Sequence, residues 1–216
     1  MKQEVEKWRP FGHPDGDIRD LSFLDAHQAV YVQHHEGKEP LEYRFWVTYS
    51  LHCFTKDYEH QTNEEKQSLM YHAPKESRPF CQHRYNLART HLKRTILALP
   101  ESNVIHAGYG SYAVIEVDLD GGDKAFYFVA FRAFREKKKL RLHVTSAYPI
   151  SEKQKGKSVK FFTIAYNLLR NKQLAERTPE SECSDSGVLC IQLRCERSHA
   201  IASAWVSGLT SHSKNS

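Results

Sequence analysis

Hydrophobic residues recur with a helical period near the middle of the chain, and this pattern predicts one main helix over residues 81–99. The apolar stripe of that helix consists of Tyr85, Ala88, Leu92, Ile96 and Leu99. These positions return to one side of a helix about every 3.6 residues. Proline directly follows the stripe, which predicts that the helix ends at this point.

Other segments alternate between apolar and polar residues and therefore predict strands. Residues 43–49 place four apolar residues on one face, and residues 112–119, 125–134 and 140–148 predict three more strands. Segment 125–134 is apolar on both faces, as expected for a central strand. Short turns join the last three strands into two hairpins, the first around Asp120-Gly-Gly-Asp123. A helix followed by such a meander predicts an α+β fold, with an antiparallel sheet and the main helix packed on one face.

The same pattern divides the chain into three regions. We expect an irregular N-terminal segment at 1–40, an α+β core domain at 41–175 and a disordered tail at 176–216. A second helix is predicted at 159–171, with Phe162, Ala165, Tyr166 and Leu169 on its apolar face. Residues 177–216 contain nine Ser and three of the five Cys, with little periodicity. Such a segment resembles a fused or frameshifted extension, and we expect it to be dispensable for folding.

Composition narrows the cellular setting. The chain has 216 residues, of which 40% are hydrophobic and 26% charged, as in globular proteins. The most apolar stretch is interrupted by Arg132 and is far too short to span a membrane. Neither a signal peptide nor a disulfide framework is apparent, since the N-terminus is charged and the number of cysteines is odd. We therefore expect a cytoplasmic protein with reduced thiols and no membrane partner.

The sequence shows no compact motif for a cofactor or a metal. The sequence contains no P-loop, dinucleotide-binding fingerprint or His-Glu-x-x-His motif, so no cofactor and no metal are expected. His52, Cys53, Cys81 and His83 could supply a Cys2His2 set, but their spacing matches no compact zinc motif. A zinc-stabilised accessory protein is therefore an alternative of lesser weight.

The last predicted strand carries the main candidate for chemistry. Its alternation places Arg141, His143 and Thr145 together on the face opposite its leucines. A cation, an imidazole and a hydroxyl are the groups that metal-free phosphodiester cleavage requires, because histidine moves protons near neutral pH and arginine stabilises phosphate charge. The alternative is an ordinary solvated strand face.

Two further candidates lie where elements begin or end. His52 follows the first strand, and strand ends often host functional sites, although it could instead cap a turn. Arg84 lies at the start of the main helix, where the helix dipole attracts phosphate. Arg89 and Lys93 extend a basic side along that helix, which could equally be a solvated face.

Positive charge is most concentrated around the second hairpin turn. The basic residues there are Arg132, Arg135, Lys137, Lys138, Lys139 and Arg141, with Glu136 as the one acid among them. The chain has a net charge of +5. This cluster favours RNA or another polyanion as a partner. The alternative is a charged turn that keeps a sheet edge soluble.

Three motifs carry a family resemblance, namely Phe45-Trp-Val-Thr-Tyr-Ser-Leu-His-Cys-Phe-Thr55, Cys81-x-x-Arg84-Tyr85-x-Leu87 and Leu142-x-Val144-x-Ser146-Ala147-Tyr148-Pro149. They resemble a family of small bacterial proteins from chromosomes and mobile elements, over about residues 40–150. That resemblance implies no particular activity. In layout alone, the helix followed by a meander resembles the barnase and RelE-like ribonuclease toxins, which cleave RNA without metal.

The layout resemblance and the candidate residues together suggest a metal-independent, possibly toxin-like endoribonuclease. In this hypothesis His143 and His52 share acid–base work, Arg84 and Arg141 bind phosphate, and Thr145 and Tyr148 position the scissile group. An antitoxin or another protein would then be a possible partner. The alternative is a non-catalytic nucleic-acid- or protein-binding accessory module that uses the same basic surface.

Overall fold

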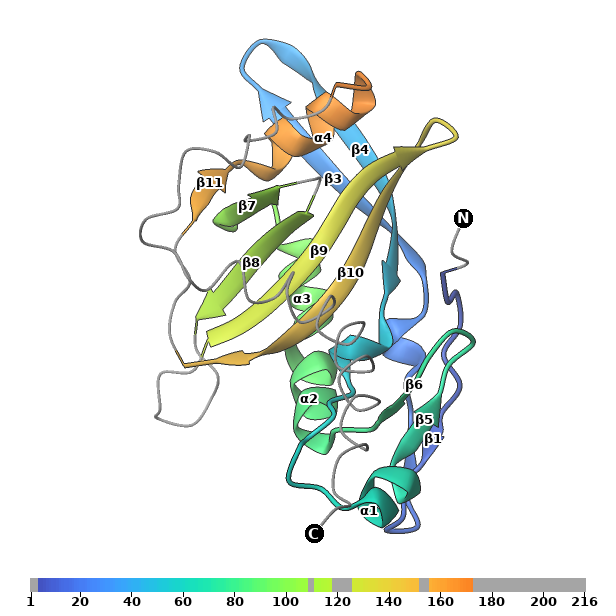
Figure 1. The fold of residues 1–216 in the computed structure, drawn as a ribbon. Coiled ribbons are helices and arrows are strands. Elements are labelled where there is room, and N and C mark those ends of the chain that lie inside the picture. The colour runs from blue at the N-terminus through green and yellow to red at the C-terminus, as the bar shows by residue number, and fades with distance from the viewer. Residues whose placement is uncertain (1–3, 109–110, 118–125, 152–155, 173–216) are drawn as a thin grey trace, which may run out of the picture. The chain divides into compact units, whose positions relative to one another are not determined.

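A seven-stranded sheet forms the centre of the fold (Figure 1). The computed structural model describes residues 4–108, 111–117, 126–151 and 156–172, all within a compact unit that spans Met1–Glu176. The strand order is β11-β7-β8-β9-β10-β4-β3. The strands are β3 (His27–His35), β4 (Lys38–Tyr49), β7 (Val104–Gly108), β8 (Ser111–Val117), β9 (Phe126–Glu136), β10 (Lys139–Ile150) and β11 (Lys157–Val159).

The predicted main helix is present as three consecutive segments, α2 (Gln82–Leu87), η3 (Ala88–Leu92) and α3 (Lys93–Leu97). All five residues of its apolar stripe are buried, which confirms the predicted face. The middle segment η3 is a π-helical turn. Its wider winding brings His91 as well as Leu92 toward the interior.

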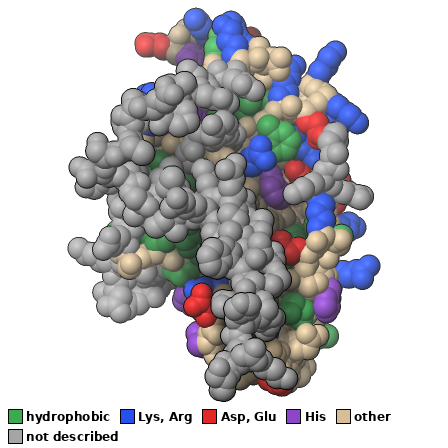
Figure 2. Space-filling model, viewed as in Figure 1, with side chains coloured by type: hydrophobic (Ala, Val, Ile, Leu, Met, Phe, Trp, Pro, Cys, Tyr) green, Lys and Arg blue, Asp and Glu red, His purple; other side chains and the backbone are tan. Residues whose placement is uncertain are grey.

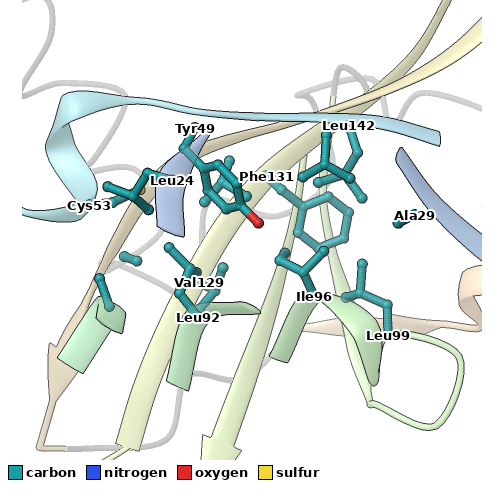
Figure 3. Close-up of a cluster of buried hydrophobic side chains, with 14 of the residues drawn as sticks. Leu24, Ala29, Tyr49, Cys53, Leu92, Ile96, Leu99, Val129, Phe131 and Leu142 are labelled. Carbon is teal, nitrogen blue, oxygen red and sulfur yellow. The ribbon is translucent and has the colours of Figure 1, made fainter. Parts of the chain in front are cut away.

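The core lies between this helix and one face of the sheet (Figure 3). Leu92, Ile96 and Leu99 face Val129 and Phe131 of β9. Tyr49 of β4 and Leu142 of β10 close the cluster from neighbouring strands. We call this helix-covered side of the sheet the inner face and the opposite side the outer face.

The α+β class, the β8-β9-β10 meander and the packed helix are confirmed, but the sheet is mixed rather than wholly antiparallel. β10 pairs with β4 in parallel, with Leu140 opposite Phe45 and Val144 opposite Tyr49. Parallel neighbours require a long connection. The main helix and the strands before β10 lie between β4 and β10 in the chain and provide this long connection. The hydrophobic pattern of a single strand does not indicate which strand will be its neighbour, so the parallel pairing was not predicted.

The N-terminal region contributes more structure than the sequence pattern suggested. β3 and the start of β4 lie before residue 41 and form an antiparallel hairpin. Trp8, Leu21 and Leu24 are buried in the core. The short elements outside the sheet are β1 (Phe11–Gly12), β2 (Ile18–Arg19), η1 (Ser22–Leu24), η2 (Leu51–Cys53), α1 (Asn63–Ser68), β5 (Met70–His72) and β6 (Ser77–Pro79).

The second helix forms as α4 (Phe161–Leu169), but its buried face differs from the predicted one. Phe161 is fully buried, with its ring centroid 4.6 Å from that of Tyr31 and 5.5 Å from that of Phe45. This anchoring turns Tyr166 and Leu169 outward, so each is 40% exposed. The hairpin turn predicted at 120–123 and the predicted tail lie outside the described residues. Within the described part of the chain, no helix is long and apolar enough to cross a membrane.

Candidate functional site

His143 lies on the outer face of the sheet, as the alternation along β10 predicted. Its neighbours Leu142 and Val144 are fully buried on the inner face. The parallel register places Thr48 of β4 directly opposite His143. Their side chains meet, with 2.9 Å between His143 Nδ1 and Thr48 Oγ1.

The hydrogen bonds around Thr48 assign the tautomer of His143. The Thr48 hydroxyl donates to Glu4 Oε2 at 2.7 Å, so its oxygen must accept from His143 Nδ1. Nδ1 therefore carries a proton, and in the neutral ring Nε2 carries the lone pair. Among the described residues, Nε2 has no hydrogen-bond partner. Burial lowers the pKa of His143, and nearby cations lower it further. A neutral, oriented imidazole of this kind can act as a general base.

Glu4 brings the remaining charges of the cluster together. Its Oε2 accepts from Arg141 Nη2 at 3.0 Å, and its Oε1 is 3.9 Å from His143 Nδ1. Arg141 Nε also lies 3.7 Å from Glu136 Oε2. We call Glu4, Thr48, Arg141 and His143 the outer-face cluster.

Arg84 belongs to a different cluster, in which its guanidinium contacts backbone carbonyls and an aromatic ring. Its Nη1 donates to the backbone carbonyls of His52 and Thr55, at 3.1 and 2.9 Å. Its guanidinium carbon lies 5.2 Å from the ring centroid of Tyr148. Burial lowers the pKa of Arg84. These contacts hold the η2 turn against the start of the main helix. Phosphate binding was predicted for the Arg84 guanidinium, which in the structure already donates to protein groups.

His52 pairs with an acid from the turn between β5 and β6. Its Nε2 is 3.3 Å from Glu76 Oε2, and Arg78 Nη1 is 3.3 Å from Glu76 Oε1. The pKa of His52 is lowered, mainly by burial and then by Arg78. Lys75, the residue before Glu76, acts electrostatically on His143. The β5–β6 turn therefore contacts His52 through Glu76 and acts on His143 only electrostatically, through Lys75.

The other two predicted catalytic residues have structural contacts. Thr145 donates to the carbonyl of Ala130 at 3.2 Å, beside the bulge where the register between β10 and β9 shifts. Tyr148 packs against Phe128, with 5.3 Å between ring centroids. The structure thus joins His143 with Arg141, and Arg84 with Tyr148 and the backbone of His52, but it does not unite all six residues.

The predicted nucleic-acid-binding residues also divide. Lys137, Lys138 and Lys139 are exposed at the β9–β10 turn, and Arg132 is exposed on β9. Arg135 instead donates to the carbonyl of Leu169 at 2.7 Å, which ties the hairpin to the end of α4. Arg89 and Lys93 are exposed on the main helix, a separate element whose buried side faces the inner face of the sheet.

Sequence reasoning missed Glu4 and the aromatic neighbours of Arg141. Strand register places Arg141 between Trp46 of β4 and Phe134 of β9, and both aromatic side chains are half-buried on the outer face. Alternation along residues 43–49 places Trp46 on the face opposite Phe45 and Val47, but it does not indicate that Trp46 lies beside Arg141. Glu4 lies 137 positions from Arg141, so no local pattern could have indicated their contact.

The structure does not assemble the alternative zinc set. No group of three or more His, Cys, Asp or Glu residues in the described ranges is placed to hold a metal ion. Cys53 and Cys81 are free, buried thiols, while His83 is exposed. Burial raises the pKa of Cys53 to about 12, which makes it a poor source of thiolate.

Fold and site together define an α+β protein whose mixed sheet carries a polar, histidine-containing outer face. Its sequence matches the YjaZ family over residues 10–169, and the chain belongs to that family. The chain is 99% identical over 176 residues to Protein YjaZ of Escherichia coli (strain K12). The aligned region covers 82% of this chain and 98% of that protein. The predicted membership of a bacterial family is thereby confirmed. No solved structure matches the chain, and the resemblance to barnase and RelE-like toxins finds no support in these similarities.

Proposed function

We propose that this protein binds RNA, or a similar polyanion, through the β9–β10 turn and the adjoining outer face of the sheet. The observation that carries the proposal is the conformation of the turn. Lys137 and Lys138 both have positive φ angles, 46° and 66°. Residues other than glycine lose roughly 1 kcal/mol in this region, and two-residue hairpin turns of this kind favour Asn-Gly. Lysines at both positions lower the stability of the turn relative to Asn-Gly and add two positive charges. Because this charge comes at a cost in stability, we infer that it has a function.

The neighbouring surface suits a nucleic-acid strand. Figure 2 shows Lys and Arg side chains at the upper right-hand margin of the visible face, where the β9–β10 turn lies in Figure 1. Lys139 continues the charge from the turn, and Trp46 and Phe134 flank Arg141 farther along the sheet. Cations bind the phosphate backbone, and aromatic rings stack on bases with little sequence preference. We therefore expect salt-dependent binding with weak sequence specificity.

Charge reversal tests this function. Replacing Lys137, Lys138 and Lys139 together with Glu should weaken binding to single-stranded RNA and flatten its dependence on salt, because fewer counterions are released. The matched control, with the same change in net charge, is Lys38→Glu with Lys157→Glu and Lys160→Glu, three exposed lysines outside this hairpin. Equal RNA affinities and salt slopes in the two variants would reject the proposal.

RNA cleavage is a second candidate, favoured by the tautomer of His143. In this scheme Nε2 removes the proton from a ribose 2′-hydroxyl as its oxygen attacks the adjacent phosphorus. The bond from phosphorus to the 5′ oxygen breaks, and the leaving oxygen takes a proton from a second acid, a role predicted for His52. Arg141 would stabilise the charge on the phosphorus centre.

His143→Ala tests the cleavage scheme. It should lower cleavage by about 100-fold or more, while activity follows a bell-shaped pH profile and survives EDTA. His83→Ala, at an exposed helix position, is the control. If the wild-type chain cleaves no single-stranded, structured or ribosome-bound RNA, the scheme fails and the binding function is unaffected.

A further inference from the structure

Glu4 occupies the position that an anionic ligand would take on the outer face. Its carboxylate accepts from the Arg141 guanidinium and from the Thr48 hydroxyl, and it lies beside the Nδ1–H of His143. We propose that Arg141, Thr48 and His143 form an oxyanion-binding site, that Glu4 fills it in the resting protein, and that a phosphate group binds there by displacing the N-terminal segment.

The three receiving groups suit a phosphate as well as they suit a carboxylate. Arginine presents a planar set of N–H donors that matches phosphate oxygens. Thr48 is fully buried but can redirect its hydroxyl to any acceptor that replaces Glu4. β4 and β10 fix the backbone positions of all three residues through their parallel pairing. The three residues are therefore adjacent on the sheet whether or not Glu4 is present.

Surrounding charge also favours an anion at this position. Lys75, Arg132 and Arg141 all act on His143 as cations, and Glu4 acts on it as the opposing charge. Glu136 offsets part of the charge on Arg141, at 3.7 Å from Nε. Without Glu4, the cations Lys75, Arg132 and Arg141 would still act on His143, and among the described residues Glu136 would remain as the acid beside Arg141. An oxyanion would restore the balance that Glu4 provides.

Glu4 can leave without unfolding the domain. The N-terminal segment is anchored after Glu4, where the Glu6 carbonyl accepts from the Ala26 N–H and Trp8 is buried against the core. The backbone N–H of Trp8 also donates to Asp25 Oδ1 at 2.8 Å. The described backbone contacts that anchor the segment therefore begin after Glu4.

This inference deepens the proposed function, because the same face would bind RNA phosphates, but its test does not depend on RNA binding. The full-length protein is titrated with inorganic phosphate by calorimetry at constant ionic strength. Glu4→Gln keeps the shape of the side chain and removes its charge. It should bind phosphate about tenfold more tightly than the wild type, since an internal competitor is lost. Glu6→Gln, an exposed acid of the same segment, is the control and should match the wild type.

Two additional measurements identify the site. Adding Arg141→Gln to Glu4→Gln should abolish the gain. In Glu4→Gln alone, phosphate should shift the NMR resonances of the His143 imidazole, a readout that does not need the double variant to fold. Equal phosphate affinity in Glu4→Gln and Glu6→Gln, or an unmoved His143 resonance, would overturn the proposal.

A dinucleotide without terminal phosphates separates the two sources of a phosphate group. If it binds Glu4→Gln more tightly than the wild type, as we expect, the site accepts an RNA phosphodiester. If only inorganic phosphate binds Glu4→Gln more tightly than the wild type, the oxyanion site is supported but its use for an RNA phosphodiester is rejected. RNA binding that is unchanged in the lysine variant would reject the proposed function but leave the phosphate result standing, so the two proposals fail separately.

Discussion

Arg84 and Arg141 were both predicted to bind phosphate, yet the structure uses them differently. Arg84 donates to two backbone carbonyls, those of His52 and Thr55, and is fixed between the η2 turn and the main helix. Arg141 donates to a carboxylate supplied by Glu4, close to the N-terminus. A carbonyl of a packed turn cannot leave without local unfolding, whereas the side chain of Glu4 can move into water. The replaceable partner marks Arg141 as the stronger candidate for ligand binding.

The largest expected effect is a difference in stability between these two arginines. Arg84→Met removes both carbonyl partners from a mostly buried position and should lower the free energy of unfolding by about 2–4 kcal/mol. Arg141→Met should cost only about 1 kcal/mol, because Glu4 can turn outward and become hydrated. Urea unfolding of the two variants measures the difference. Equal losses would show that Glu4 is as firmly held as the η2 turn, and would contradict the comparison.

Sequence patterns were sufficient where a role depended on local periodicity. The stripe of the main helix and the inward and outward sides of β10 both follow from spacing, so the buried Leu142 and the outward-facing His143 were predicted correctly. The role of Arg84 was not predictable, because its acceptors are main-chain groups that any sequence contains. The parallel pairing that brings Thr48 to His143 spans 95 positions and depends on the return path of the chain.

The β9–β10 turn provides a second contrast, since its lysines have no partner to compensate for their backbone strain among the described contacts. Replacing Lys137 and Lys138 with Asn and Gly should raise the free energy of unfolding by about 1 kcal/mol, because these residues tolerate positive φ. The same variant should bind RNA more weakly. A turn that gains stability but keeps full RNA affinity would show that the lysines serve only solubility.

The smallest expected effect is a loss of stability on acidification, and it involves both histidines. The pKa values of His52 and His143 are lowered from the ordinary 6.5, mainly by burial. The unfolded chain therefore binds more protons just below that pH, so stability is complete above about pH 6.5 and falls as the pH drops toward the folded-state values.

His143→Asn keeps an N–H that can donate to Thr48 but no longer titrates, so its melting temperature should fall less between pH 7 and 5.5 than that of the wild type. His52→Asn should reduce the fall in the same direction, and thermal melts at matched ionic strength measure both. If His143→Asn also weakens the acid sensitivity of Glu4→Gln, the imidazole itself carries the effect. If His143→Asn changes the acid sensitivity of the melting temperature only while Glu4 is present, then the interaction between Glu4 and His143 governs the response of the outer face to pH. Burial of the imidazole would in that case not be the cause.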